Sequence, residues 1–154
     1  MRLALLVVLP GCLLGGGPVL AVRPKAKVAL GYEVSGNLGM LGIEGGNTFP
    51  LNGGRTMGYF AARGTLALDP SRGDRIVGID EETATHLNLM IGGGRAEGRG
   101  GLAAGVAPMM VWGDRECGGD DKVFTLTLGV RTVAGLTELY VAPKANIYSP
   151  FCFD

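Results

Sequence analysis

Hydrophobic and polar residues alternate from Lys122 to Tyr148, which predicts two long β-strands joined by a tight turn at Ala134-Gly135. In each strand one face is apolar and the opposite face is small or polar. The apolar faces hold Phe124, Leu126, Leu128 and Val130 in the first strand and Leu139, Val141, Ala145 and Ile147 in the second. This period of two residues is typical of a sheet, and it returns along most of the chain.

Further strands are predicted over Lys27–Ser35, Leu38–Glu44, Thr56–Leu68, Glu82–Ile91 and Gly101–Trp112, with short candidates at Val19–Arg23 and Arg75–Ile79. Turns or loops are predicted at Gly36-Asn37, Gly45–Arg55, Gly92–Gly100 and Asp114–Asp121. No helical periodicity extends beyond about two turns. Seven or eight strands in sequence predict an all-β fold, an antiparallel up-and-down β-barrel of about eight strands, because closure removes exposed edges.

The N-terminus is predicted to be a targeting segment. Met1-Arg2 is followed by an apolar run from Leu3 to Leu14, which has the length of a secretory signal rather than of a membrane-spanning helix. Cleavage after Ala21 would give a signal peptide over residues 1–21 and a barrel domain over residues 22–154, with Gly15–Lys25 mainly a spacer. Alternatively, Leu9-Pro10-Gly11-Cys12 resembles a bacterial lipoprotein signal, in which residues 1–11 are removed and Cys12 is lipidated. Both cleavages place the protein outside the cytoplasm.

The composition of the chain argues against some classes of binding partner. The chain has 154 residues, enough for one domain, with 14 basic and 14 acidic side chains. This balance provides no basic surplus for binding nucleic acid or anionic lipid. Apolar types make up 47% of the residues and charged types only 18%, which is sparse polar cover for a soluble β-protein.

The second face of the strands indicates which side lines the barrel. This face carries many Ala and Gly residues and a few separated charges: Glu33, Arg63, Arg131, Glu138 and Lys144. The narrow interior of an eight-stranded barrel suits small residues and paired charges, whereas a solvated sheet surface would carry many long polar side chains. We therefore expect this face to line the interior and the apolar face to contact lipid. Strands of ten to thirteen residues are long enough for a tilted crossing.

Across roughly residues 27 to 148, this pattern resembles the small outer-membrane β-barrels of Gram-negative bacteria. The resemblance implies an outer-membrane location with lipid as the partner, and a plugged interior in which the five charges form an ion-pair network. The expected role is structural, adhesive or interaction-based through the loops Gly45–Arg55 and Asp114–Asp121, without cofactor or metal. The alternative is a soluble, lipocalin-like barrel tethered through Cys12, in which Leu126, Leu128 and Val141 line a cavity for an apolar ligand.

Three other features of the sequence bear on its chemistry. Cys117 and Cys152 form an even pair in an exported chain and are predicted to make a disulfide.

The acidic residues of the loop Asp114–Asp121 fit no EF-hand spacing, so a solvated loop is expected there rather than a calcium site. Some small outer-membrane barrels are lipid-modifying hydrolases with a His and Ser pair, but no Ser neighbours the single histidine, His86, along its strand. A non-enzymatic protein is therefore expected, with the hydrolase as a minor alternative.

Overall fold

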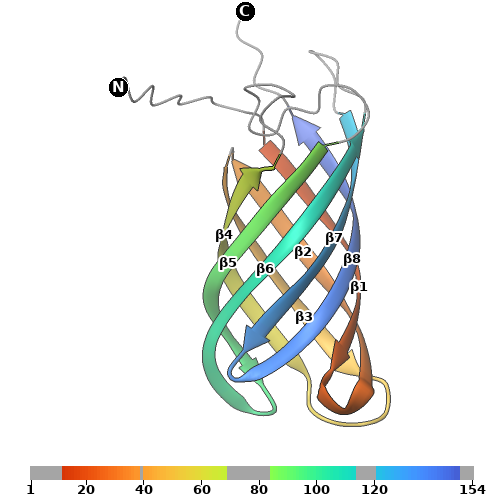
Figure 1. Cartoon of the computed structure of the whole chain (residues 1–154), viewed down its shortest axis with the longest axis vertical. Helices are drawn as coiled ribbons and strands as arrows, with labels where there is room; N and C mark the ends of the chain where they lie inside the picture. The colour runs from red at the N-terminus through yellow and green to blue at the C-terminus, as the bar shows by residue number, and fades with distance from the viewer. Residues whose placement is uncertain (1–11, 39, 69–83, 114–120, 150–154) are drawn as a thin grey trace, which may run out of the picture.

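The computed structural model describes residues 12–38, 40–68, 84–113 and 121–149, which form a closed antiparallel barrel of eight strands (Figure 1). The strands are β1 (Cys12–Arg23), β2 (Lys27–Leu38), β3 (Leu41–Pro50), β4 (Met57–Ala67), β5 (Ala84–Ala96), β6 (Arg99–Gly113), β7 (Asp121–Val133) and β8 (Leu136–Ser149). Each strand pairs with the next along the chain, and β1 pairs with β8 to close the sheet. The predicted up-and-down barrel is confirmed.

The first strand is longer than the sequence suggested. Cys12–Arg23 forms β1, so the interpretation of Gly15–Lys25 as mainly a spacer is wrong. Its glycines are typical of a linker, but here they allow neighbouring strands to approach closely: a Cβ atom on Gly17 would collide with the backbone of Pro143 in β8. The side chains of Val19 and Ala21 are fully buried in the barrel. Cleavage after Ala21 would therefore remove most of β1, whereas cleavage before Cys12 would leave it whole.

The two ends of the barrel differ. At the end where β1 begins and β8 ends, here called the terminal end, β2 also passes to β3 (Figure 1). The opposite end, here called the short-turn end, holds the connections at residues 24–26, 51–56, 97–98 and 134–135. Ala134-Gly135 and Glu97-Gly98 both have positive φ at their two residues, as two-residue hairpin turns with the twist of their strands require. The predicted turn at Ala134-Gly135 is confirmed.

Three other turn predictions were wrong because their glycines lie inside strands. Gly36-Asn37 belongs to β2, most of Gly92–Gly100 lies within β5 and β6, and residues 45–50 lie within β3, so that only residues 51–56 of the predicted loop Gly45–Arg55 connect strands. Gly92 illustrates the cause, since a Cβ atom there would collide with Ala61 on β4. Glycine in this chain often marks close packing of strands rather than a bend.

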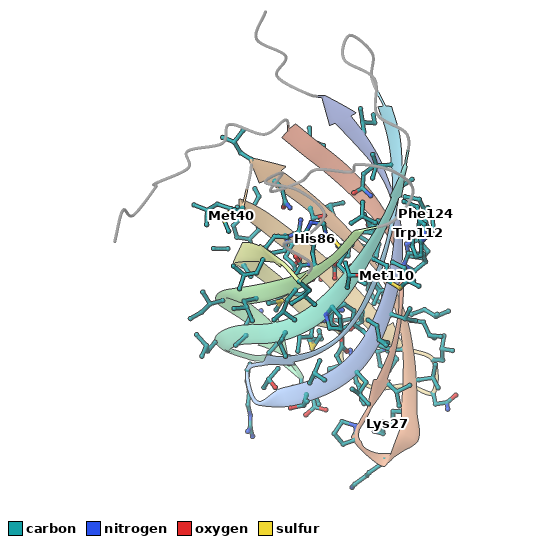
Figure 2. The ribbon with its side chains drawn as sticks, turned by 45° about the horizontal axis from the view of Figure 1, so that its top comes forward. Lys27, Met40, His86, Met110, Trp112 and Phe124 are labelled. Atoms are coloured by element: carbon teal, nitrogen blue, oxygen red, sulfur yellow. The ribbon has the colours of Figure 1, made fainter. Side chains whose placement is uncertain are left out.

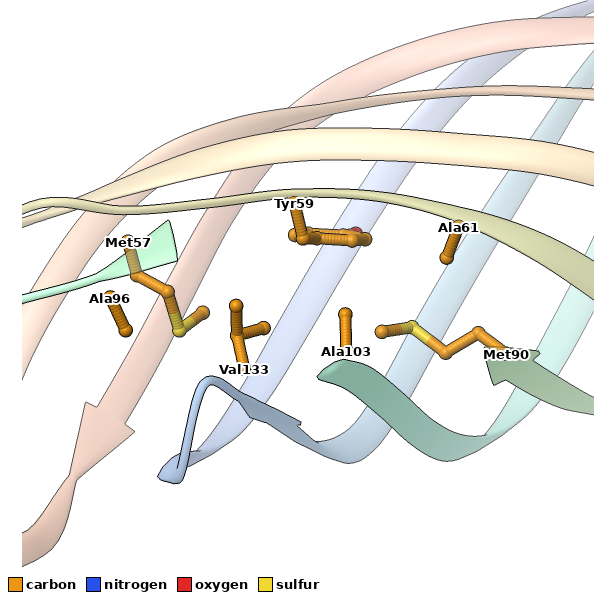
Figure 3. Packing of buried hydrophobic residues seen from close by; sticks show 7 residues of the cluster. All are labelled: Met57, Tyr59, Ala61, Met90, Ala96, Ala103 and Val133. Atoms are coloured by element: carbon orange, nitrogen blue, oxygen red, sulfur yellow. The ribbon is translucent and has the colours of Figure 1, made fainter. Parts of the chain in front are cut away.

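Side chains alternate strictly between the two sides of the wall, as Figure 2 shows around the barrel. The interior contains two apolar clusters. One is formed by Met57, Tyr59, Ala61, Met90, Ala96, Ala103 and Val133 (Figure 3). The other is formed by Val19, Ala21, Ala29, Ala107, Tyr140 and Ala142. Alanine is the commonest residue in both clusters, because the narrow barrel leaves little room beside the long polar side chains.

Candidate functional site: a charged interior within an apolar wall

Arg131 is the centre of the polar interior. Its guanidinium is 2.6 Å from a carboxylate oxygen of Glu33 and 2.7 Å from one of Glu138, and all three side chains are almost completely buried. Arg131 also donates a hydrogen bond of 2.7 Å to the Tyr59 hydroxyl, which in turn donates to Glu33 at 2.6 Å. The rings of Tyr59 and Tyr140 lie 4.6 and 4.2 Å from the guanidinium carbon. The cation is thus held by two carboxylates and by two aromatic rings.

The network continues from Glu138 towards the short-turn end. Glu138 is bound by Arg23, the last residue of β1, at 3.2 Å, and it accepts a hydrogen bond of 3.2 Å from the Thr48 hydroxyl. Arg23 also donates to that hydroxyl at 2.8 Å and to the Thr48 carbonyl at 3.2 Å. Residues from β1, β3, β7 and β8 therefore meet across the barrel, so the interior is bridged from wall to wall.

A second arm of the network extends towards the terminal end. Lys144 pairs with Glu33, and Arg63 pairs with Glu44 at 3.2 Å and with Asn37. The Tyr59 hydroxyl lies 3.3 Å from Glu44, so it links the Arg63 pair to the Arg131 cluster. Every charged member of the network is at most 6% exposed. The surrounding interior side chains thus shield these charges from water.

The structure brings together the five charges singled out in the sequence, although not in one cluster. Glu33, Arg131, Glu138 and Lys144 are in direct contact, whereas Arg63 belongs to a separate pair with Glu44. Sequence reasoning missed Arg23 and Glu44 because Gly15–Lys25 was interpreted mainly as a spacer and Glu44 was placed at the end of a short predicted strand, Leu38–Glu44. The signal was present: both residues alternate with apolar neighbours in the same way as Glu33 does.

Large apolar side chains cover the outer wall. Leu128, Leu139 and Phe60 are 61%, 59% and 62% exposed, and most outward positions of the other strands are also apolar. Among the strand side chains that the structure describes, the exposed charges are Lys27, Arg95 and Arg99, each within two residues of a turn at the short-turn end. Trp112 and Phe124 lie against each other towards the terminal end, with ring centroids 6.0 Å apart (Figure 2).

The residues expected to line a ligand cavity in a lipocalin-like barrel do not point inward. Leu126, Leu128 and Val141 alternate with the buried residues Thr127 and Ala142, so they lie on the outer face. The interior opposite them carries the charges and small residues described above. These three residues therefore do not line the interior of the barrel.

His86 faces the interior and is 2% exposed. Its partners in register are Ala67 on β4 and Met109 on β6, neither of which is a nucleophile. Its Nδ1 atom has no hydrogen-bond partner in the structure. The register partners of His86 thus supply no hydroxyl or thiol beside its ring.

Several other predicted features fall outside the described residues. Cys117, Cys152 and most of the loop Asp114–Asp121 belong to these segments, as does the candidate strand Arg75–Ile79, so the disulfide and the loop role stay predictions. Cys12 is the first residue of β1, and its lipidation also stays a prediction. Within the residues that the structure covers, no group of His, Cys, Asp and Glu side chains is arranged to hold a metal ion.

Comparisons with known proteins add no relative to this picture. No protein-family model, curated protein or solved structure matches the chain. Over the described ranges, none of the helical segments has the length and hydrophobicity needed to cross a membrane.

Proposed function

We propose that this protein is a membrane-embedded β-barrel of the outer membrane of a Gram-negative bacterium, non-enzymatic and non-conducting, with a structural or interaction role through the residues at its ends. The observation that carries the proposal is the apolar outer wall, with its described exposed charges near one end. Apolar surface costs about 25 cal/mol per Å² in water, and soluble monomers rarely expose large continuous apolar patches. Hydrocarbon is the solvent in which such a wall is stable.

The buried contacts in the interior support the non-conducting part of the proposal. Arg131 on β7 pairs across the interior with Glu33 on β2 and also with Glu138 on the neighbouring strand β8, and two apolar clusters are buried in the same interior. Ions would have to break these contacts to pass. We therefore expect no channel activity from the folded protein in a planar bilayer.

The proposal is tested by placing an arginine at two outward positions at different depths. Leu128 lies near the middle of β7, and Thr137 is an exposed residue two positions after the β7–β8 turn. In lipid, Leu128→Arg should cost about 2–4 kcal/mol, whereas Thr137→Arg, close to the interface, should cost about 0–1 kcal/mol. The measurement is the folded fraction in phosphatidylcholine vesicles, read as the heat-modifiable band on a gel.

A soluble barrel would give the opposite order. In that case the parent chain would stay monomeric in buffer without detergent, and Leu128→Arg would be neutral or would improve solubility. The substitution Cys12→Ser distinguishes the lipid-tethered soluble barrel from the integral barrel. It would release a tethered barrel from membranes, whereas an integral barrel would stay in the membrane and resist carbonate washing. Equal vesicle folding of both arginine variants would refute the membrane proposal.

A further inference from the structure

The exposed basic side chains of the described residues gather at the short-turn end. They are Lys25, Lys27, Arg55, Arg95 and Arg99, here called the basic rim. Glu97 is the one acidic side chain described as exposed, because Glu33, Glu44 and Glu138 are buried in the interior. A chain with equal numbers of acidic and basic residues thus carries a strongly positive surface at one end. The equal numbers of acidic and basic residues argued against anionic partners, but they do not reveal that the exposed basic residues lie together at one end.

The basic rim is held in place without being neutralised. Arg55 donates a hydrogen bond of 2.6 Å to the backbone carbonyl of Glu97, and Arg95 donates to the carbonyl of Gly98 at 3.3 Å. Arg23 anchors the same loop through a 3.1 Å hydrogen bond to the Arg55 carbonyl. None of the ion pairs between described residues includes a member of the rim. The guanidinium groups are thus oriented by neutral carbonyls and keep their charge available.

A depression of about 180 Å³ lies within this end of the barrel. Its wall includes Arg23, Lys25, Lys27 and Arg55, together with the turn residue Glu97. Gly53 and Gly54, both with positive φ, form part of the lining in the connection between β3 and β4. A phosphate group suits such a site, since Lys25, Lys27 and Arg55 line a concave surface to which the glycines of the loop add little side-chain bulk.

The position of the rim identifies the kind of phosphate. Arg95 lies on the outer side of β5, four residues beyond Ile91, which is 63% exposed on the same face. In a membrane this places cationic groups directly above apolar wall, at the level of lipid headgroups. We propose that the basic rim binds the phosphate of an anionic lipid in the leaflet that the short-turn end faces. This inference rests on the proposed membrane location.

The test uses the full chain folded in a neutral detergent and exposed to equal amounts of phosphatidylglycerol and phosphatidylcholine, with the retained lipids counted by native mass spectrometry. Each cation near an anionic surface is worth roughly a fivefold gain in affinity. The parent should retain phosphatidylglycerol over phosphatidylcholine by about tenfold or more at low salt. This preference should shrink in 0.5 M NaCl, because at that concentration salt screens electrostatic attraction beyond a few ångström.

A charge-removing variant is compared with a charge-conserving control. Lys25→Gln, Lys27→Gln and Arg55→Gln together should reduce the preference to less than about twofold. Lys25→Arg, Lys27→Arg and Arg55→Lys keep the charge and should retain most of it. An unchanged preference in the glutamine variant would overturn the proposal, and so would full competition by millimolar inorganic phosphate at constant ionic strength, which would assign the site to a free anion.

The outcome also separates this inference from the proposed function. A parent chain that inserts into vesicles but retains both lipids equally would remove the lipid site and leave the membrane barrel standing. A parent chain that never inserts would remove both. Retention of phosphatidylglycerol only by a chain that inserts, and only with the rim charges present, would establish the site.

Discussion

Replacing Arg131 by methionine should destabilise the folded barrel more than any change to an exposed charge. Methionine keeps much of the length and the apolar stem of arginine but removes its charge and its hydrogen-bond donors. The substitution leaves Glu33 and Glu138 without the cation that lies 2.6 and 2.7 Å from them. It also removes the group stacked between the rings of Tyr59 and Tyr140.

The expected loss of stability depends on which cation each carboxylate still contacts after the substitution. Removing one partner of a buried ion pair typically costs about 3–5 kcal/mol, because the other charge stays buried without compensation. Here Glu138 keeps Arg23 and Glu33 keeps Lys144, which argues for the lower end of that range. The lost cation–π contacts add about 0.5–2 kcal/mol. We therefore expect Arg131→Met to lower the free energy of unfolding by about 3–5 kcal/mol.

The assay is reversible urea unfolding of the barrel in neutral detergent micelles, followed by the fluorescence of the single tryptophan, Trp112. Arg95→Met at the rim serves as the matched control and should change stability by less than about 0.5 kcal/mol. The double variant Arg131→Met with Glu138→Gln should lose less than the sum of the two single variants, with a coupling of about 0.5–3 kcal/mol. A loss below 1 kcal/mol for Arg131→Met would refute the reasoning, since it would mean that water replaces the guanidinium inside the barrel.

Two further predictions concern the wall. Gly92→Ala should destabilise the barrel by about 1–3 kcal/mol, because the new methyl group would collide with Ala61 on β4. Gly64→Ala is the control: its methyl group meets no neighbouring atom, so the free energy of unfolding should change little. Urea unfolding measures both variants. Deleting residues 2–11 should leave a barrel that folds in detergent, whereas deleting residues 2–21 removes most of β1 and should abolish the heat-modifiable folded band. Equal folding of the two truncated chains would contradict the role given to β1.

The alternation of side chains was sufficient to predict the architecture. In β7 and β8 the apolar and small residues keep their period over the whole strand, and both the strands and the Ala134-Gly135 turn were predicted. The sides were predicted as well: Leu128 and Leu139 are exposed, and Arg131 and Glu138 are buried. Period-two patterning is a local property, so a sequence can carry it without reference to the partner strand.

Glycine is where prediction from the sequence failed. In Gly15-Gly16-Gly17 and Gly92-Gly93-Gly94, the residues lie within strands, although clustered glycines are usually typical of turns. Their role depends on which backbone passes alongside: Pro143 for Gly17, and Ala61 for Gly92. Such contacts join residues far apart in the chain, so no local pattern reveals them. For the same reason, the sequence did not predict the whole of β1, the strand that supplies Arg23 to the interior network.

The buried charges also determine how the strands are aligned. A slip of one residue in any strand would exchange its two faces and place charges such as Glu33 or Arg131 on the apolar outer wall. If the proposed membrane location holds, an arginine near the midplane would cost about 2–4 kcal/mol there. A slip of two residues would keep the faces but would separate Arg131 from Glu138, which are directly opposite in β7 and β8, by about 7 Å. Apolar and alanine contacts are similar in neighbouring registers and discriminate poorly. The ion pairs are therefore among the interactions that distinguish the observed register from its neighbours, and this gives the buried charges a structural role.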